Sequence, residues 1–150
     1  MPMNYEELAN QLLENSYKFR RNSHQAKIDE SMRGEHFVLS YIDKMEGGVL
    51  PGEISNEMAI STARTAAALN SLENKGLIKR EIDKNDRRRI LVYLTPQGKE
   101  LAEKRKRVVL ESARNMLEWL GEEDAKEFVR IIGRFSEFPA KNRDQEEKNV

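Results

Sequence analysis

The sequence contains no cysteine and no apolar run long enough to cross a bilayer. The first absence excludes disulfides, thiolate metal ligands and cysteine nucleophiles. The second absence, together with an N-terminus that lacks a signal-peptide pattern, predicts a cytoplasmic protein without a membrane partner. Glycine-rich phosphate loops, dinucleotide turns and HExxH patterns are also missing, so the sequence predicts neither an enzyme nor a bound cofactor.

Histidine is scarce, because only His24 and His36 are present. An expected loop separates them, so they cannot form a two-histidine metal site on one helix. One alternative joins a histidine to a nearby carboxylate of Asp29, Glu30 or Glu35. The more ordinary arrangement is an exposed His24 and a His36 packed at the start of a helix. We expect the ordinary arrangement and predict no metal site.

Charge of one sign is not in excess over the whole chain, which has 26 Lys or Arg and 26 Asp or Glu. The distribution is uneven, however. Residues 60–95 carry eight basic and four acidic side chains, whereas residues 1–59 carry six basic and ten acidic ones. A local positive excess is the electrostatic pattern expected of a segment that contacts phosphates.

The same segment has the pattern of a helix followed by a β-hairpin. Alanine-rich sequence over 62–75 favours a helix, and Gly76 suits the left-handed turn that ends one. Strands are expected over 77–82 and 90–94, with a charged tip between them. A helix followed by a basic hairpin is the layout of a winged helix-turn-helix, in which the helix enters the DNA major groove. This layout predicts a DNA-binding repressor or activator.

Upstream sequence completes the winged unit, which we expect over about 33–95. A helix is expected from Arg33 to Met45, with Phe37, Val38, Tyr41 and Ile42 turned inward. Val49 and Leu50 could add a third strand to the hairpin. Pro51 suits the first position of a short helix that runs to Met58, with Ile54 and Met58 facing the core, and Ser61 suits the N-cap of the next helix.

Amphipathic helices lie outside the winged unit at both ends of the chain. The first covers about 4–22, and two more cover 96–120 and 122–138, with Gly121 between them. Their apolar stripes predict a helical dimerisation layer built from both termini, although the helices could instead fold back on their own subunit. The expected fold is mainly α (α+β), with one domain over 1–139 and a disordered charged tail over 140–150.

A linear motif resembles the signature of the MarR family of bacterial and archaeal regulators. It reads Asp86-x-Arg88-x-x-x-x-x-Leu94-Thr95, followed by Pro96-x-Gly98, and is preceded by Leu72-Glu73-x-Lys75-Gly76-Leu77-Ile78-x-Arg80. The resemblance covers about residues 5–138. It implies a homodimer that places each recognition helix in a major groove of double-stranded DNA and each wing tip in the flanking minor groove.

By this resemblance, Arg88 and its neighbour Arg87 enter the minor groove, and Asp86 holds the arginine in a fixed pose. A narrow minor groove attracts arginine, and a carboxylate can fix the geometry of a guanidinium group, so the assignment agrees with the physics. The alternative is that the three arginines of the tip are simply solvated.

The recognition helix offers few side chains for reading bases. Its outward positions include Ala66 and Ala67, which can only touch a thymine methyl group or let the helix approach closely. The remaining DNA-binding candidates on this helix are Ser61, Thr62, Arg64 and Asn70. We therefore predict modest base specificity and steep salt dependence.

Many members of the MarR family, which this sequence resembles, bind small aromatic or amphipathic effectors in a cleft between the dimer layer and the winged lobe. The candidates on this chain, by position only, are Tyr17, Arg20, His36, Tyr41 and Val109. An equally ordinary interpretation makes the aromatics core residues and Arg20 a surface charge. The favoured function is a dimeric, effector-relieved repressor, and the alternative is a winged-helix protein–protein interaction module with weak or no DNA binding.

Overall fold

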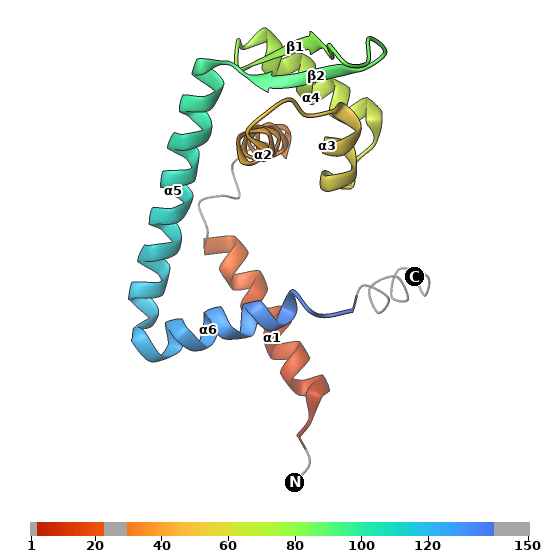
Figure 1. Ribbon diagram of the computed structural model, residues 1–150. Coiled ribbons are helices and arrows are strands. Elements are labelled where there is room, and N and C mark those ends of the chain that lie inside the picture. The colour runs from red at the N-terminus through yellow and green to blue at the C-terminus, as the bar shows by residue number, and fades with distance from the viewer. Residues whose placement is uncertain (1–2, 23–29, 140–150) are drawn as a thin grey trace. The chain divides into compact units, whose positions relative to one another are not determined.

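The computed structural model describes residues 3–22 and 30–139 of the chain (Figure 1), in two compact units, Met1–Ala102 and Glu103–Val150. In chain order the helices and strands of the described residues are α1 (Tyr5–Asn22), α2 (Glu30–Met45), α3 (Pro51–Met58), α4 (Thr62–Asn74), β1 (Ile78–Ile82), β2 (Ile90–Leu94), α5 (Pro96–Leu120) and α6 (Glu122–Phe135). None of these helices is long and apolar enough to cross a membrane. Six helices and one hairpin confirm the mainly α, winged-helix fold class.

The core of the first unit lies in the winged lobe, which we define as residues 34–102. Its buried apolar residues are Val38, Leu39, Ile42, Val49, Ile54, Leu69, Leu72, Ile78, Val92 and Ala102. In Figure 1, α2, α3 and α4 gather around one face of the hairpin. The prediction for α2 was partly wrong, because Leu39 is buried whereas Phe37 is 45% exposed. Phe37, Val38 and Leu39 are three consecutive apolar residues, so the sequence pattern alone did not decide which of them face the core.

The turn from α3 to α4 is built as predicted. Pro51 begins α3, and the Ser61 hydroxyl caps α4 by accepting a hydrogen bond from the Arg64 backbone N–H at 3.2 Å. Between the two helices, the Ser55 and Thr65 hydroxyls form a buried hydrogen bond of 2.8 Å. This bond explains why α4 has a threonine on its core face, because a hydroxyl there has a partner.

The sheet has two strands, with Ile78 opposite Leu94 and Ile82 opposite Ile90 in an antiparallel register. Val49 adds only an isolated bridge to Val92, through backbone hydrogen bonds of 3.0 and 2.8 Å. The predicted third strand over 49–50 is therefore limited to one residue. Its extension is blocked because the Leu50 N–H donates to the Glu53 carboxylate at 3.0 Å, where α3 begins.

The start of α5 is fastened to the end of α4 by the residues of the linear motif. The Thr95 hydroxyl donates to the Gly76 carbonyl at 2.6 Å and accepts from the Gly98 N–H at 3.1 Å. A Cβ atom at position 98 would lie 1.9 Å from the Leu77 carbonyl oxygen, so only glycine fits this approach. Gly76 itself has φ +72°, which favours glycine.

The helices outside the winged lobe have exposed apolar side chains. On α1 these include Leu12, Leu13, Tyr17 and Phe19, and on α6 they include Phe128, Ile131, Ile132 and Phe135. The prediction that α6 reaches Phe138 was wrong, because it ends at Phe135. Pro139 disfavours helical geometry at the residue before it, and the chain closes instead with short-range backbone bonds from Glu137 and Phe138.

One boundary in the first unit also differs from the prediction. Helix α2 begins at Glu30 rather than at Arg33, because its apolar stripe starts only after a polar first turn. Asn4 caps α1 by accepting hydrogen bonds from the backbone N–H groups of Glu6 and Glu7 at 3.1 and 3.2 Å. The expected tail over 140–150 and His24 lie outside the described residues.

Candidate nucleic-acid interface

Helix α4 has one buried face and one exposed face. Thr65, Leu69 and Leu72 are buried in the lobe. The exposed face carries the predicted contact residues Ser61, Thr62, Arg64, Ala66, Ala67 and Asn70, together with Ala63. The structure therefore brings the helix candidates together on one accessible surface. Ser61 has a structural role at its start, because its hydroxyl caps the helix.

The C-terminal end of α4 is held to α2 by Glu35. Its carboxylate accepts hydrogen bonds from the Ser71 hydroxyl at 2.5 Å and from the Lys75 ammonium group at 2.6 Å. Burial alone would raise the pKa of Glu35, but these two bonds outweigh it and hold the pKa below its ordinary value. Sequence reasoning missed this contact, because the partners are 36 and 40 residues apart.

Arg80 on β1 reaches across to α4. Its Nη2 atom donates to Asn70 Oδ1 at 2.8 Å, and its Nε atom lies 3.6 Å from the Glu73 carboxylate. One predicted contact residue, Asn70, is thus already engaged through its oxygen. Arg80 was not among the predicted contact residues, and only the arrangement of hairpin against helix could have identified it.

The wing tip is organised by Asp83, whose side chain is buried. Its carboxylate accepts from the Asn85 N–H at 2.9 Å and from the Arg89 guanidinium group at 2.8 and 3.3 Å. The hydrogen bond from the Asn85 backbone and those from Arg89 lower the pKa of Asp83. The hairpin turn closes with a backbone hydrogen bond of 2.9 Å from Asp83 to Arg89.

The expected role of Asp86 was wrong in one respect. Asp86 Oδ1 accepts a hydrogen bond of 3.0 Å from the backbone N–H of Arg88 and does not bind its guanidinium group. The carboxylate that holds a guanidinium in this turn belongs to Asp83, and the arginine is Arg89. Asp86 therefore shapes the backbone that carries Arg88.

Arg87 and Arg88 are exposed at the tip, and neither side chain has a carboxylate partner among the described residues. Three consecutive arginines thus divide into one that stabilises the turn and two that extend from it. Two unpaired guanidinium groups on a rigid turn can bind phosphates or enter a narrow, electronegative groove.

Comparison with known proteins identifies this arrangement. Residues 32–89 match the model of the MarR family. Over these residues the chain is similar to the MarR family of transcriptional regulators. It is 29% identical over 142 residues to YwhA of Bacillus subtilis, an uncharacterized HTH-type transcriptional regulator, and the match covers 90% of this chain and 100% of the relative.

Solved structures show the same fold. YusO of Bacillus subtilis has a TM-score of 0.70 at 23% identity, over 92% of this chain and 100% of its own. FabT of Streptococcus pneumoniae, solved in complex with DNA, has a TM-score of 0.69 at 22% identity, over 90% of this chain and 96% of its own. This chain therefore shares its fold with these proteins.

The five effector candidates do not form a site within either unit. Tyr17 and Arg20 are exposed on α1, and Val109 is exposed on α5 in the other unit. His36 and Tyr41 are half-buried on α2. Burial raises the pKa of Tyr41, with a further contribution from Glu53 and Glu57, and its ring packs against the core.

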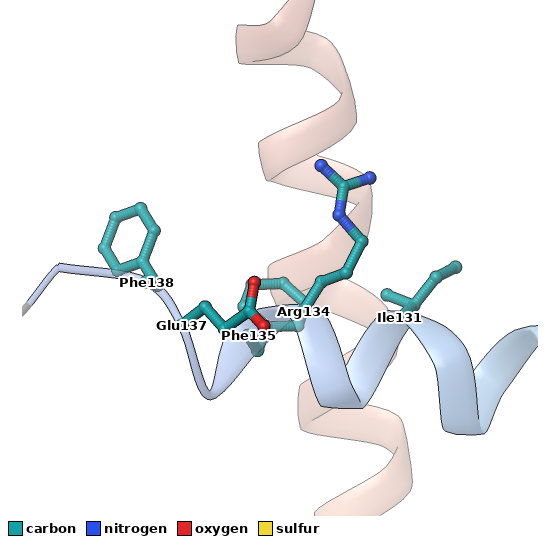
Figure 2. Close-up of a pocket in the computed structure, with 5 residues that line it drawn as sticks. All are labelled: Ile131, Arg134, Phe135, Glu137 and Phe138. Carbon is teal, nitrogen blue, oxygen red and sulfur yellow. The ribbon is translucent and has the colours of Figure 1, made fainter.

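An open hollow of another kind lies along α6. Figure 2 shows its lining, which consists of Ile131, Arg134, Phe135, Glu137 and Phe138. The apolar members belong to the exposed stripe of the helix, so the hollow has the character of an uncovered packing face. Within residues 3–22 and 30–139, no cluster of three acidic or histidine side chains could hold a metal ion.

Proposed function

We propose that this chain binds operator DNA as a homodimer and represses transcription until a small aromatic or amphipathic effector releases it. Each recognition helix, residues 62–75, would enter a major groove, and each wing, residues 84–89, would enter a minor groove. Two lobes related by a twofold axis require a palindromic operator, with half-sites about one helical turn apart.

The observation that carries this proposal is that the three arginines of the wing tip have different contacts. Arg89 is bound to the buried Asp83, whereas Arg87 and Arg88 are exposed and unpaired among the described residues. Nothing in the stability of the hairpin requires two further guanidinium groups at its tip. Their positive charge suits a minor groove, where the electrostatic potential is most negative when the groove is narrow.

On α4 the proposed contacts combine polar and small side chains. Thr62, Arg64 and Asn70 would make the hydrogen bonds, and Ala66 and Ala67 would allow the helix to approach the base edges. Few hydrogen-bonding side chains imply modest base specificity. Phosphate contacts would then supply much of the affinity, so binding should weaken steeply as salt increases.

The homodimer is supported by the exposed apolar side chains of α1, α5 and α6, which exceed what an isolated helix surface normally exposes. The proposed effector cleft would use Tyr17, Arg20, His36, Tyr41 and Val109, from three different helices. An effector that binds only one arrangement of the two lobes would shift the population away from the DNA-binding arrangement.

The test is binding of the purified protein to DNA from upstream of its own gene, across a series of salt concentrations. A fragment of equal length and composition without a palindrome is the matched control. We expect one dimer per palindromic site and a steep fall in affinity with salt. Equal affinity for both fragments would contradict specific binding to a palindromic operator. An absence of binding at low salt would overturn the whole proposal.

One observation favours a second candidate, the protein–protein interaction module. The exposed face of α4 carries three alanines, Ala63, Ala66 and Ala67, which offer a partner helix a flat apolar surface. An absence of salt-dependent DNA binding would favour this module, whereas salt-dependent binding would exclude it as the main function.

A further inference from the structure

Arg80 and Asn70 form a hydrogen-bonded pair on the exposed face of α4. Arg80 Nη2 donates to Asn70 Oδ1 at 2.8 Å. Arg80 also lines a hollow between α3, α4 and the strands of the hairpin, together with Thr62, Ala66 and Ile90. The pair therefore borders the same surface that carries the proposed DNA contacts.

Arg80 is well placed to hold this bond. Its guanidinium group lies between two residues one helical turn apart on α4, because its Nε atom is 3.6 Å from the Glu73 carboxylate. Its backbone is fixed in the antiparallel ladder opposite Val92, which is fully buried. The side chain is about one-third exposed, so α4 and the strand restrict its movement more than they would restrict a free surface arginine.

The bond fixes which end of the Asn70 amide faces away from Arg80. An asparagine amide has an acceptor at Oδ1 and two N–H donors at Nδ2. A guanidinium group has only donors, so it can pair with Oδ1 and would repel Nδ2. Nδ2 is then turned away from Arg80, and it has no hydrogen-bond partner among the described residues.

We infer that Arg80 is a positioning residue that makes Asn70 a hydrogen-bond donor to a guanine in the major groove. This inference rests on the proposed DNA-binding function. Asparagine commonly reads adenine, by accepting from N6 and donating to N7. Here a positive charge lies against the oxygen that adenine N6 would have to approach. Guanine presents two acceptors, N7 and O6, and no donor at this edge, so it suits both Asn70 Nδ2 and the neighbouring guanidinium group.

The experiment selects operators from a randomised DNA library with the full-length protein, three single variants and the double variant Asn70→Ala/Arg80→Met. Asn70→Ala identifies the base that Asn70 contacts, and Arg80→Met removes the positioning group. Lys79→Met is the matched control, because it removes the same charge from the adjacent residue of β1, whose side chain points to the opposite face of the strand. Preferences at all other operator positions report whether each variant still folds and docks correctly.

We expect the wild-type protein to select guanine at one position of each half-site, with about tenfold discrimination against adenine. Asn70→Ala and Arg80→Met should each abolish most of that discrimination at this position alone, and Lys79→Met should retain it. Arg80→Met added to Asn70→Ala should cause no further loss there, since the two residues act as one unit.

Other outcomes separate failure of this inference from failure of the proposed function. If the wild-type protein selects adenine at the position that Asn70→Ala relaxes, or if Arg80→Met leaves the guanine preference intact, the inference is overturned and DNA binding stands. The same holds if Asn70→Ala changes no base preference. If the wild-type protein binds no DNA at low salt, both proposals are overturned.

Discussion

The winged lobe and the C-terminal unit use similar apolar residues in opposite ways. In the lobe, Leu69 and Leu72 are 1% and 0% exposed, whereas Leu110 and Phe135 of the C-terminal unit are 69% and 61% exposed. Apolar side chains stabilise the folded state when they leave water, so exposed leucines and phenylalanines contribute little to the stability of the single chain. The lobe is therefore stabilised by its own core, whereas the exposed side chains of the C-terminal helices agree with the proposed dimer interface.

Polar contacts differ between the two regions in the same sense. In the lobe they join separate elements, as Glu35 of α2 joins Ser71 of α4 and Lys75 at the C-cap of that helix. In the C-terminal unit they connect residues three or four apart on one helix, as in the pair of Lys126 and Glu122. Exposed pairs of that local kind stabilise a helix only slightly and fix no tertiary structure. Both kinds of contact show that the lobe is held together by its own tertiary contacts, and they support the proposal that a second copy covers the C-terminal unit.

The largest difference is expected from removing a leucine in each region. Leu72→Ala would leave a cavity in the lobe and lower its free energy of unfolding by about 2–5 kcal/mol. Leu110→Ala removes the same atoms from an exposed position and creates no cavity within its own unit. Urea denaturation at one fixed protein concentration measures both effects. Equal losses would show that Leu110 is buried in the assembled protein as fully as Leu72.

A charge on the apolar face of α6 should separate the two copies without unfolding the lobe. Phe135→Lys places an ammonium group on the stripe that includes Phe128, Ile131 and Ile132. We expect the dissociation constant of the dimer to rise by about 100-fold, as at a central interface residue. Sedimentation velocity over a concentration series measures it, and Lys126→Ala on the same helix is the control. An unchanged constant would contradict the assignment of α6 to the dimer interface.

Local chemistry made much of the fold predictable from the sequence. Ser61 caps α4 through the backbone N–H of Arg64, and Gly76 has the positive φ of a left-handed turn after α4, as the sequence predicts. Tertiary contacts were not predictable in this way. The link between Asn70 and Arg80 depends on how the hairpin lies against α4, which no residue spacing specifies.

In the wing tip, even contacts between residues close in sequence could not be predicted. Its seven residues contain two aspartates and three arginines, so several pairings fit the sequence equally well. Asp83 rather than Asp86 binds a guanidinium group because Asp83 follows β1 directly and turns inward, where its carboxylate meets Arg89. The motif identified the arginines as important but could not assign their separate roles.

Neighbouring arginines at the tip provide a matched test of those roles. Arg88→Ala should lower operator affinity by about tenfold and leave the thermal midpoint of unfolding unchanged, because its side chain has no partner in the lobe. Arg89→Ala removes the same charge but leaves the buried Asp83 carboxylate without its guanidinium partner, so it should lower the midpoint. Fluorescence anisotropy with labelled DNA and differential scanning calorimetry measure the two quantities. Identical effects of both variants on affinity and midpoint would show that Arg88 and Arg89 do not have separate roles.

The smallest expected effect is a change in how folding stability falls at low pH. It compares a buried carboxylate with an exposed one. The hydrogen bonds from Asn85 and Arg89 lower the pKa of Asp83, and the hydrogen bond from Arg130 lowers the pKa of Glu127 on α6. A lowered pKa in the folded state contributes stability that is fully present above the ordinary pKa and is lost as the pH falls through the folded value. Asp83→Asn and Glu127→Gln should therefore each reduce the loss of stability on acidification below about pH 4.

Salt should distinguish the two carboxylates, because added ions screen exposed pairs far more than buried ones. At high salt we expect the contribution of Glu127 to the acid dependence to vanish and that of Asp83 to persist. Urea denaturation of both variants and the wild type, from neutral pH to about pH 3 at low and high salt, measures the contributions. If salt removed both contributions equally, the Asp83–Arg89 pair would be as solvent-screened as a pair on a single exposed helix. The contrast between a lobe held by tertiary contacts and the local ion pairs of α5 and α6 would then not extend to the wing tip.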